Sequence, residues 1–293
     1  MSSAPGPTWL EVALNGPWSR ALQPGIPIAV EEIVAEGVRC AEAGAAIVHL
    51  HAYDEATGLQ RDDPDIYAAI IEGIRERVDA IVYPTIPFSP EAASGSGAKR
   101  FAAVAELAAR GLLEWTVVDP GTVNISGFDQ MTAGEDGIVY ANPDEHIRAG
   151  LAIAERHAIH PSYAIYEPGF LRQGAHLAHL HPRMPRPIYR FMFSQGFAFG
   201  FPPEEYALEA YLELLQHVEP GAKWMVAGLA VDIRPLVEPT LKRGGHLRVG
   251  LEDAPLGSPW SNLEWVEHAV AMIEDFGGTL ASAAEVRAAL KGD

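Results

Sequence analysis

The chain repeats one pattern eight times: a short apolar run of strand length, followed by a stretch with helical periodicity. The strand candidates, rich in β-branched and aromatic residues, span 9–14, 45–51, 80–86, 115–121, 162–167, 188–194, 223–228 and 247–252. The helix candidates span 29–44, 63–78, 99–111, 143–157, 171–180, 204–218, 233–244 and 262–277. The stretch 171–180 has the weakest helical pattern, yet it must serve as the fifth crossover helix.

Eight such units with no linker between them predict an α/β protein: a single (β/α)8 TIM barrel that takes up residues 1–293 as one catalytic domain. A doubly wound sheet with an appended domain fits less well, because no break in composition divides the chain. With 48% hydrophobic residues, the chain can fill a large core. The last stretch, 282–293, is a helix candidate that would cap the bottom of the barrel or mediate contacts.

Composition restricts the partners and the compartment. A formal net charge of −18 argues against nucleic acid and anionic membranes, although an anionic small molecule needs only a local positive patch. No apolar run reaches the roughly 18–20 residues that cross a bilayer, and no signal-like segment opens the chain, so we expect a cytoplasmic protein. The one cysteine, Cys40, excludes an internal disulfide and lies on the expected buried face of a helix.

The second strand candidate ends in His49-Leu50-His51. Residues i and i+2 of a strand project to the same side, so the two imidazoles can bind one cation. Glu252, at the end of the eighth strand candidate, is the expected third ligand, because the first, second and eighth strands are neighbours in a closed barrel. A metal-free histidine pair within a polar barrel mouth is the alternative. The position at a strand end favours a metal, of which Zn²⁺ is one that takes such a set.

A second histidine group lies in "GAHLAHLH", with His176, His179 and His181. Two of them share the spacing of three that would bring them to one helix face. No acid accompanies them, and the stretch precedes a proline-rich segment, so a solvated or partner-facing helix is the favoured interpretation.

Other polar residues also follow predicted strands, where the chemistry of a barrel takes place. Each has a structural alternative: Arg248 and Asp253 can form an ion pair at the rim, and Glu167 can cap a loop. Asp119, which precedes Pro-Gly, is interpreted as a turn residue. Further strand-end candidates are Asn15, Thr85 and Asn124, and Asn15 can instead form a turn with Gly16-Pro17.

Two long segments resemble the β-keto acid cleavage enzymes, the family of the 3-keto-5-aminohexanoate cleavage enzyme. They are "EEIVAEGVRCAEAGAAIVHLHAYDEATG" and "LRVGLEDAPLGSPWSNLEWVEHAVAM", and a looser similarity continues through the middle of the chain. The resemblance implies a TIM barrel, commonly with one divalent metal per chain, most often Zn²⁺, and acetyl-CoA as cosubstrate. It also implies a homo-oligomer, a dimer or a tetramer.

The resemblance assigns roles to individual residues. His49, His51 and Glu252 match the metal ligands, and Arg248 and Asp253 match a pair that positions and activates the reacting groups. Glu167 is similar to the fifth-strand acid of the family. Two hydroxyl residues, Thr85 and Thr122, fall near third- and fourth-strand substrate positions, and Asn15 is expected near the distal end of the substrate. This chain departs from the family where "VYPTIPFS" replaces a Thr-Gly-Gly type of segment and where Tyr53 replaces an arginine.

The activity implied by this resemblance is the condensation of a β-keto acid with acetyl-CoA, followed by retro-Claisen cleavage to acetoacetate and a new acyl-CoA. Asp253 is the first choice for the base that removes the proton, and Glu167 is the second. A metal-dependent amide or ester hydrolase is the alternative enzyme, although the usual version carries histidines at the fifth and sixth strand ends, which this chain lacks. A non-catalytic metal- or ligand-binding barrel is the third hypothesis.

Overall fold

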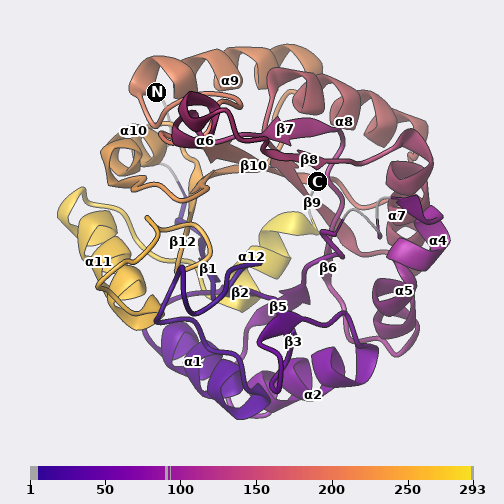
Figure 1. The fold of residues 1–293 in the computed structure, drawn as a ribbon. Helices are drawn as coiled ribbons and strands as arrows, with labels where there is room; N and C mark the ends of the chain where they lie inside the picture. The colour runs from indigo at the N-terminus through magenta and orange to yellow at the C-terminus, as the bar shows by residue number, and fades with distance from the viewer. Residues whose placement is uncertain (1–5, 90–91, 93, 292–293) are drawn as a thin grey trace.

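A ring of eight parallel strands forms the centre of the computed structural model, which describes residues 6–89, 92 and 94–291 (Figure 1). In chain order these strands are β1 (Leu10–Ala13), β2 (Ile47–Leu50), β5 (Ile81–Pro84), β6 (Trp115–Val117), β9 (His160–Ile165), β10 (Ile188–Phe193), β11 (Trp224–Gly228) and β12 (His246–Val249). Hydrogen bonds join them in the order β5-β2-β1-β12-β11-β10-β9-β6. The terminal strands of that order, β5 and β6, lie next to each other, so the barrel is nearly closed. The predicted TIM barrel is confirmed.

Helices surround the strands on the outside (Figure 1). They are α1 (Val30–Glu42), α2 (Pro64–Arg75), α4 (Gly97–Arg100), α5 (Ala102–Ala109), α7 (Asp144–His157), α8 (Pro168–Leu180), α9 (Glu205–Val218), the 3₁₀ turn η1 (Arg234–Leu236), α10 (Val237–Lys242) and α11 (Asn262–Asp275). The predicted helix 99–111 is divided at Phe101, whose φ of −95° and ψ of 13° are not helical. The weak stretch 171–180 lies within α8, which buries Phe170, Leu171, Gly174 and Ala175, and this confirms it as the fifth crossover.

The interior of the barrel is filled in layers by every second strand residue. At the bottom, the ring of Trp9 stacks on His246 with centroids 4.0 Å apart and contacts Trp115 at 6.3 Å. Helix α12 (Ala283–Leu290) covers this end, where Arg287 binds the carboxylates of Asp79 and Glu114 just before β5 and β6. The capping role expected for 282–293 is thereby confirmed for its described part; residues 292 and 293 lie outside the described residues.

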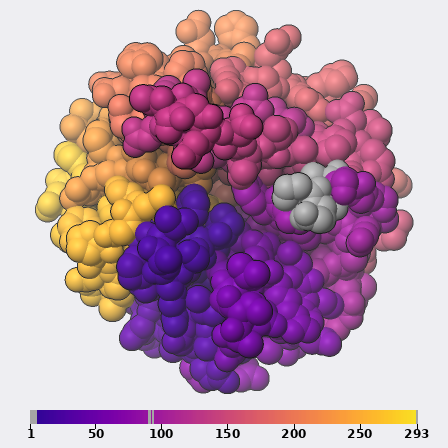
Figure 2. Space-filling view, viewed as in Figure 1, coloured from indigo at the N-terminus to yellow at the C-terminus, as the bar shows by residue number. Residues whose placement is uncertain are grey.

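Two excursions that sequence analysis did not predict lie at the other end of the barrel. One is the hairpin β3 (Tyr53–Asp54) and β4 (Leu59–Gln60), which follows β2. The other is β7 (Val123–Ile125), α6 (Phe128–Ala133) and β8 (Ile138–Tyr140), which follows β6. Figure 2 shows the segment after β1, in indigo, and the α6 excursion, in magenta, on opposite sides of the middle of this face. In the described part of the chain, no helix combines the length and hydropathy needed to cross a bilayer.

The chain turns sharply at Gly250, directly after β12 and two residues before Glu252. Its φ is +126°, and a Cβ atom there would lie 2.3 Å from the carbonyl oxygen of Ala13 in β1. A glycine is therefore required by both the backbone angle and the close approach of the neighbouring strand.

We predict that Gly250→Ala lowers the free energy of unfolding by at least ~2 kcal/mol, because the added methyl group must push β1 and β12 apart. Gly257→Ala is the control: its φ is +70°, but nothing lies within 4 Å of the added Cβ, so only ~1 kcal/mol of backbone strain is expected. Urea unfolding of the three proteins measures both effects. Equal losses in the two variants would contradict the role of the close approach.

Candidate metal centre and active-site cavity

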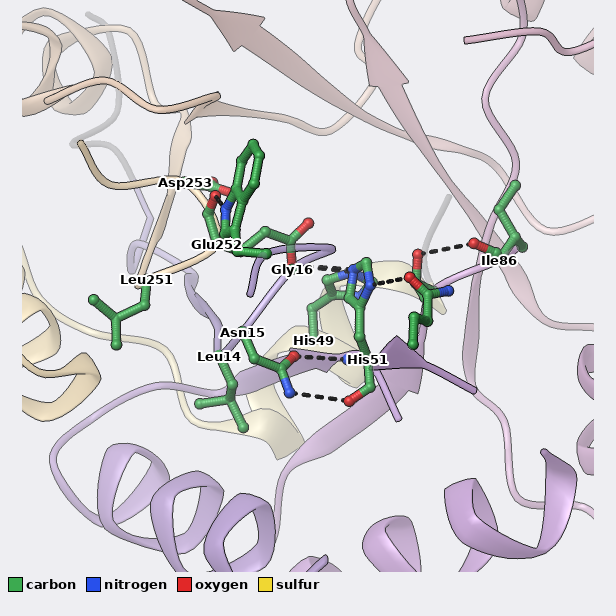
Figure 3. Close-up of polar contacts among 12 residues, drawn as sticks. Leu14, Asn15, Gly16, His49, His51, Ile86, Leu251, Glu252 and Asp253 are labelled. Atoms are coloured by element: carbon green, nitrogen blue, oxygen red, sulfur yellow. Dashed lines mark hydrogen bonds and ion pairs between the residues drawn. The ribbon is translucent and has the colours of Figure 1, made fainter. Parts of the chain in front are cut away.

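His49 and His51 lie at the carboxyl end of β2 and project into the mouth of the barrel (Figure 3). Both are buried, with 2% and 3% of their surface exposed, although each carries polar nitrogens. The alternation predicted from the sequence is present: Leu50, between them, is fully buried on the other side of the strand. The two rings stand nearly perpendicular, with centroids 5.5 Å apart.

Glu252 approaches the two histidines from the segment after β12. Strand β12 pairs with β1, and β1 pairs with β2, so the first, second and eighth barrel strands are neighbours as expected. Glu252 Oε2 lies 3.5 Å from Nε2 of His49 and 3.5 Å from Nε2 of His51. Figure 3 shows the carboxylate and both rings directed toward a common point.

These three side chains fit a metal ion. Their possible ligand atoms all lie within 4.8 Å of one another. Among the described residues, the buried atoms His51 Nε2 and Glu252 Oε2 have no hydrogen-bond partner, and such atoms are rarely left unsatisfied without a ligand. Two imidazoles and one carboxylate are a donor set used by catalytic Zn²⁺ and by other divalent transition metals, with positions left open for substrate.

A second layer of hydrogen bonds fixes the orientation of His51. Its Nδ1 lies 2.9 Å from Oε1 of Gln60, whose Nε2 donates to Asp62. The amide of Asn15 binds the backbone of His51 twice: its Oδ1 accepts from the nitrogen at 2.8 Å and its Nδ2 donates to the oxygen at 3.0 Å. Asn15 thus holds the end of β2, whereas Gln60 was missed by sequence analysis because it belongs to the unpredicted β3–β4 hairpin.

Arg248 lies behind the carboxylate of Glu252 and is 1% exposed. Its Nη2 contacts Glu252 Oε1 at 2.7 Å and Asp253 Oδ1 at 2.8 Å, and its Nε donates to Asp253 Oδ2 at 2.9 Å. Its Nη1 donates at 3.3 Å to Glu11, which also accepts from the hydroxyl of Tyr83 at 2.6 Å. Arg248 and Asp253 therefore form a fully buried bidentate pair, and their carboxylate and guanidinium groups belong to one charged network with Glu252.

Electrostatics support a neutral imidazole and an ionised carboxylate at the candidate metal centre. Burial lowers the pKa of His49 well below its usual value, so the ring is in the form that binds metals. Burial alone would raise the pKa of Glu252, but Arg248 and the two histidines bring it well below its usual value. Burial raises the pKa of Asp253 to about 6, against the opposing effect of Arg248.

A cavity of about 570 Å³ opens above the three candidate ligands. Its polar lining includes Thr85, Asp119 and Arg190, and its walls carry apolar and aromatic side chains, among them Tyr140 and Tyr166. Thr85 is thus near the candidate metal centre, as expected. Asp119 was interpreted as a turn residue but lines the cavity; its Oδ2 accepts from Tyr140 and its Oδ1 from the nitrogen of Ala164. Arg190 was not singled out from the sequence at all.

Other residues predicted near the site lie elsewhere. Thr122 is exposed, and its hydroxyl accepts from the nitrogen of Asn142 at 2.9 Å, outside the cavity lining. Glu167 is the residue before α8, and its Oε1 accepts from the nitrogen of Gly200 at 3.1 Å; it too is absent from the cavity lining. The strand-end residues that face the cavity from β9 and the turn after it are Ala164 and Tyr166.

Tyr53, which stands where the resemblance leads us to expect an arginine, supports the segment after β1. Its hydroxyl donates to the backbone oxygens of Gly16 and Trp18, and Nε1 of Trp18 donates to the backbone oxygen of Glu252 at 2.8 Å. Burial raises the pKa of Tyr53 beyond its ordinary range, so the hydroxyl remains a donor. This position therefore has a structural task in this chain.

The histidines of "GAHLAHLH" do not converge. His179 binds Glu219 with Nε2 2.7 Å from Oε2, and His181 lies 3.2 Å from Glu155. His176 is exposed on α8. They belong to the outer surface of a crossover helix, as the solvated interpretation predicts.

Known proteins resemble this chain over nearly its full length. The family model described as beta-keto acid cleavage enzyme matches residues 7–291. A 3-oxoadipate:acetyl-CoA acetyltransferase of Cupriavidus necator is 28% identical over 298 residues, which cover 97% of this chain and 94% of the relative. A 3-keto-5-aminohexanoate cleavage enzyme of Fusobacterium nucleatum subsp. nucleatum is 25% identical over 277 residues and 90% of each chain.

A solved structure supports the fold. The apo structure of ObcA superposes with a TM-score of 0.72 at 20% sequence identity, covering 92% of this chain and 66% of that chain. The family match over residues 7–291 and the whole-length relatives together show that this chain belongs to the β-keto acid cleavage enzyme family.

Proposed function

We propose that this chain is a metal-dependent enzyme that condenses a β-keto acid with acetyl-CoA and cleaves the product to acetoacetate and a new acyl-CoA. The observation that carries the proposal is the convergence of His49, His51 and Glu252 at the floor of a cavity, backed by a buried arginine, in a member of this family. The names of the relatives, which include acetyl-CoA transferases and cleavage enzymes, support the same reaction class.

In this proposal His49, His51 and Glu252 hold one divalent cation per chain, with Zn²⁺ as the expected metal. When bound, the cation supplies Lewis acidity that polarises the keto group of the substrate and acidifies the neighbouring carbon. Gln60 and Asn15 orient His51, and Arg248 orients Glu252 through its second oxygen.

Asp253 is proposed as the base, and Arg248 as the group that holds it and stabilises negative charge on oxygen. The bidentate contact fixes the carboxylate of Asp253 beside Glu252, and Arg248 itself lines the cavity. Neither Asp253 nor Glu167 is in the cavity lining. Glu167 receives a positioning role because its carboxylate accepts from the nitrogen of Gly200, whereas that of Asp253 is bound to Arg248, which does line the cavity. Thr85 is proposed to contact the substrate. Asn15 acts through the backbone of His51, and Thr122 holds the loop after β6 through Asn142.

The proposed reaction first joins the two substrates and then divides the product. Asp253 takes a proton from the carbon between the carboxylate and the keto group, and that carbon attacks the carbonyl of the acetyl thioester. The CoA thiolate leaves and then attacks the original keto carbon. The bond between this carbon and its neighbour breaks, the new acyl-CoA forms, and the proton returns to the released acetoacetate.

The hydrolase alternative has no support in the lining of the cavity. The residues that line it from β9, β10 and the segments that follow them are Ala164, Tyr166, Arg190, Met192, Gly196 and Phe197, which include no histidine. From the family resemblance, we propose that the enzyme works as a homo-oligomer, a dimer or a tetramer, in the cytoplasm.

We predict about one metal ion per native chain and its loss in a His49→Ala/His51→Ala double variant, because two of three protein ligands are removed. Mass spectrometry of the purified, zinc-supplied proteins measures the metal, and release of acetoacetate from acetyl-CoA with a panel of β-keto acids measures activity. His179→Ala on the outer face of α8 is the matched control and should retain both. A folded native chain that binds no supplied metal would refute the proposal.

We predict that Gln60→Ala weakens metal binding about 10–100-fold, because His51 loses the hydrogen bond that fixes its ring. Competition with a chromogenic chelator measures the dissociation constant. Gln173→Ala, which removes a surface contact to Asp144, should leave it unchanged. Equal affinity in the native chain and the Gln60 variant would show that the hairpin does not support the metal centre.

We predict that Asp253→Asn lowers kcat about 10²–10⁴-fold, because the amide keeps the shape of the side chain but cannot take a proton. Glu167→Gln should stay within about threefold of the native kcat, because its amide oxygen still accepts from Gly200. Steady-state kinetics with retained metal content in both variants provide the test. The opposite ranking would assign the base to Glu167.

A further inference from the structure

Arg190 is a buried cation of the cavity that the proposed reaction does not use. It lies in β10, the sixth barrel strand, and lines the same cavity as His49, His51 and Glu252. Only 3% of its surface is exposed. Burial opposes its charge, but Tyr83, Glu11 and Asp119 nearby more than offset this and keep its pKa above the ordinary value. The side chain is therefore a guanidinium ion in a largely apolar chamber.

The strands on either side of Arg190 bring no counter-ion. In the register of the sheet it lies opposite Ala164 of β9 and Met225 of β11, and neither side chain carries a charge. The one hydrogen bond of its side chain among the described residues runs from Nη2 to the backbone oxygen of Ser162, at a long 3.3 Å. Its Nε has no partner there, and no described carboxylate oxygen lies within the 4.0 Å of an ion pair.

The nearest acids are engaged elsewhere. Asp119 accepts from the hydroxyl of Tyr140 and from the backbone of Ala164 with its two oxygens. Glu11 accepts from Tyr83 and from Arg248 with Oε1; its Oε2 has no hydrogen-bond partner among the described residues and forms no ion pair with Arg190. Both carboxylates therefore stabilise the charge of Arg190 without forming an ion pair with it. The N–H groups of its guanidinium remain available to a ligand in the cavity.

Arg248 shows what a satisfied arginine requires in this barrel. It contacts the carboxylates of Glu11, Glu252 and Asp253, all within 3.3 Å. Burying a guanidinium without such partners is unfavourable, and an anionic ligand would supply the partner that Arg190 lacks. A second donor stands close by: Tyr166 follows Ala164 by two residues and lines the same cavity, and no hydrogen bond of its hydroxyl is found within the described residues.

We propose that Arg190 binds a second carboxylate of the substrate, so that this chain acts on short 3-oxo dicarboxylic acids. The inference rests on the proposed function, in which the carboxylate and keto oxygens at the reacting end belong to the metal centre. Arg190 then remains for an anionic group at the other end of the molecule. A planar guanidinium suits a carboxylate because it can donate two parallel hydrogen bonds. The apolar walls accommodate the methylene groups between the two ends.

The test compares 3-oxoadipate with 3-oxohexanoate, which share six carbons and differ in a terminal carboxylate or methyl group. Acetoacetate release from acetyl-CoA by the metal-loaded native chain should favour the dicarboxylic acid by at least ~100-fold in kcat/KM, because the methyl group would leave the guanidinium unpaired. Arg190→Gln should lose this preference, because kcat/KM for the dicarboxylic acid should fall ~100-fold. The kcat/KM for 3-oxohexanoate should stay within about threefold of the native value. Arg190→Lys keeps the charge and should retain part of the preference.

Three outcomes would overturn the inference while leaving the proposed function intact: no preference in the native chain, a preference for 3-oxohexanoate, or an equal loss for both substrates in Arg190→Gln. An equal loss would place the guanidinium at the shared, reacting end. Thermal unfolding of both variants shows whether they are folded.

If neither keto acid is converted, calorimetric binding of unreactive adipate and hexanoate still tests Arg190. Adipate should bind the native chain at least ~10-fold more tightly than hexanoate, and this difference should disappear in Arg190→Gln. Equal binding of the two acids to the native chain would refute the inference without any appeal to catalysis.

Discussion

The charge of Arg248 is the constraint on which the barrel mouth depends. A guanidinium that is 1% exposed is tolerable only with several anionic partners, and Glu11, Glu252 and Asp253 provide them from β1 and from the turn after β12. Because Glu252 binds Arg248 with one carboxylate oxygen, its other oxygen is directed toward the two histidines. The same contacts that compensate a buried cation thus orient the candidate metal ligands.

The barrel and the convergence of the three candidate metal ligands could be predicted from the sequence because both follow from local periodicity. Strand alternation places His49 and His51 on one side, and the closure of eight βα units makes β12 a neighbour of β1, which brings Glu252 close. The β7–α6–β8 excursion could not be predicted, since it interrupts the repeat after β6 with elements too short for a periodic signal. Gln60 was missed for the same reason.

The charged residues inside the strands were missed although they carry a signal. Glu11 and Arg190 are each a single charged residue within an otherwise apolar strand, in "WLEVAL" and "IYRFMFS". In a barrel, an inward-facing residue within a strand can reach the site as well as one at the strand end. Burying a charge there is unfavourable unless a partner or a ligand compensates it. Glu167 shows the converse: it follows a strand, but the chain turns before its side chain reaches the cavity.

Glu11 and Arg190 differ in how their charge is balanced. This difference suggests a structural role for Glu11 and a ligand-binding role for Arg190. Glu11 lies beside the guanidinium of Arg248, so protein groups alone account for its burial. Arg190 has Ala164 and Met225 as its register neighbours, and both acids near it bind other groups, although Oε2 of Glu11 has no hydrogen-bond partner among the described residues. The nearby anionic groups offset its burial from a distance, but no described carboxylate forms an ion pair with it. An anionic group of the substrate would supply that ion pair. One residue on the sixth strand, Arg190, would then set the substrate preference of a reaction that the family shares.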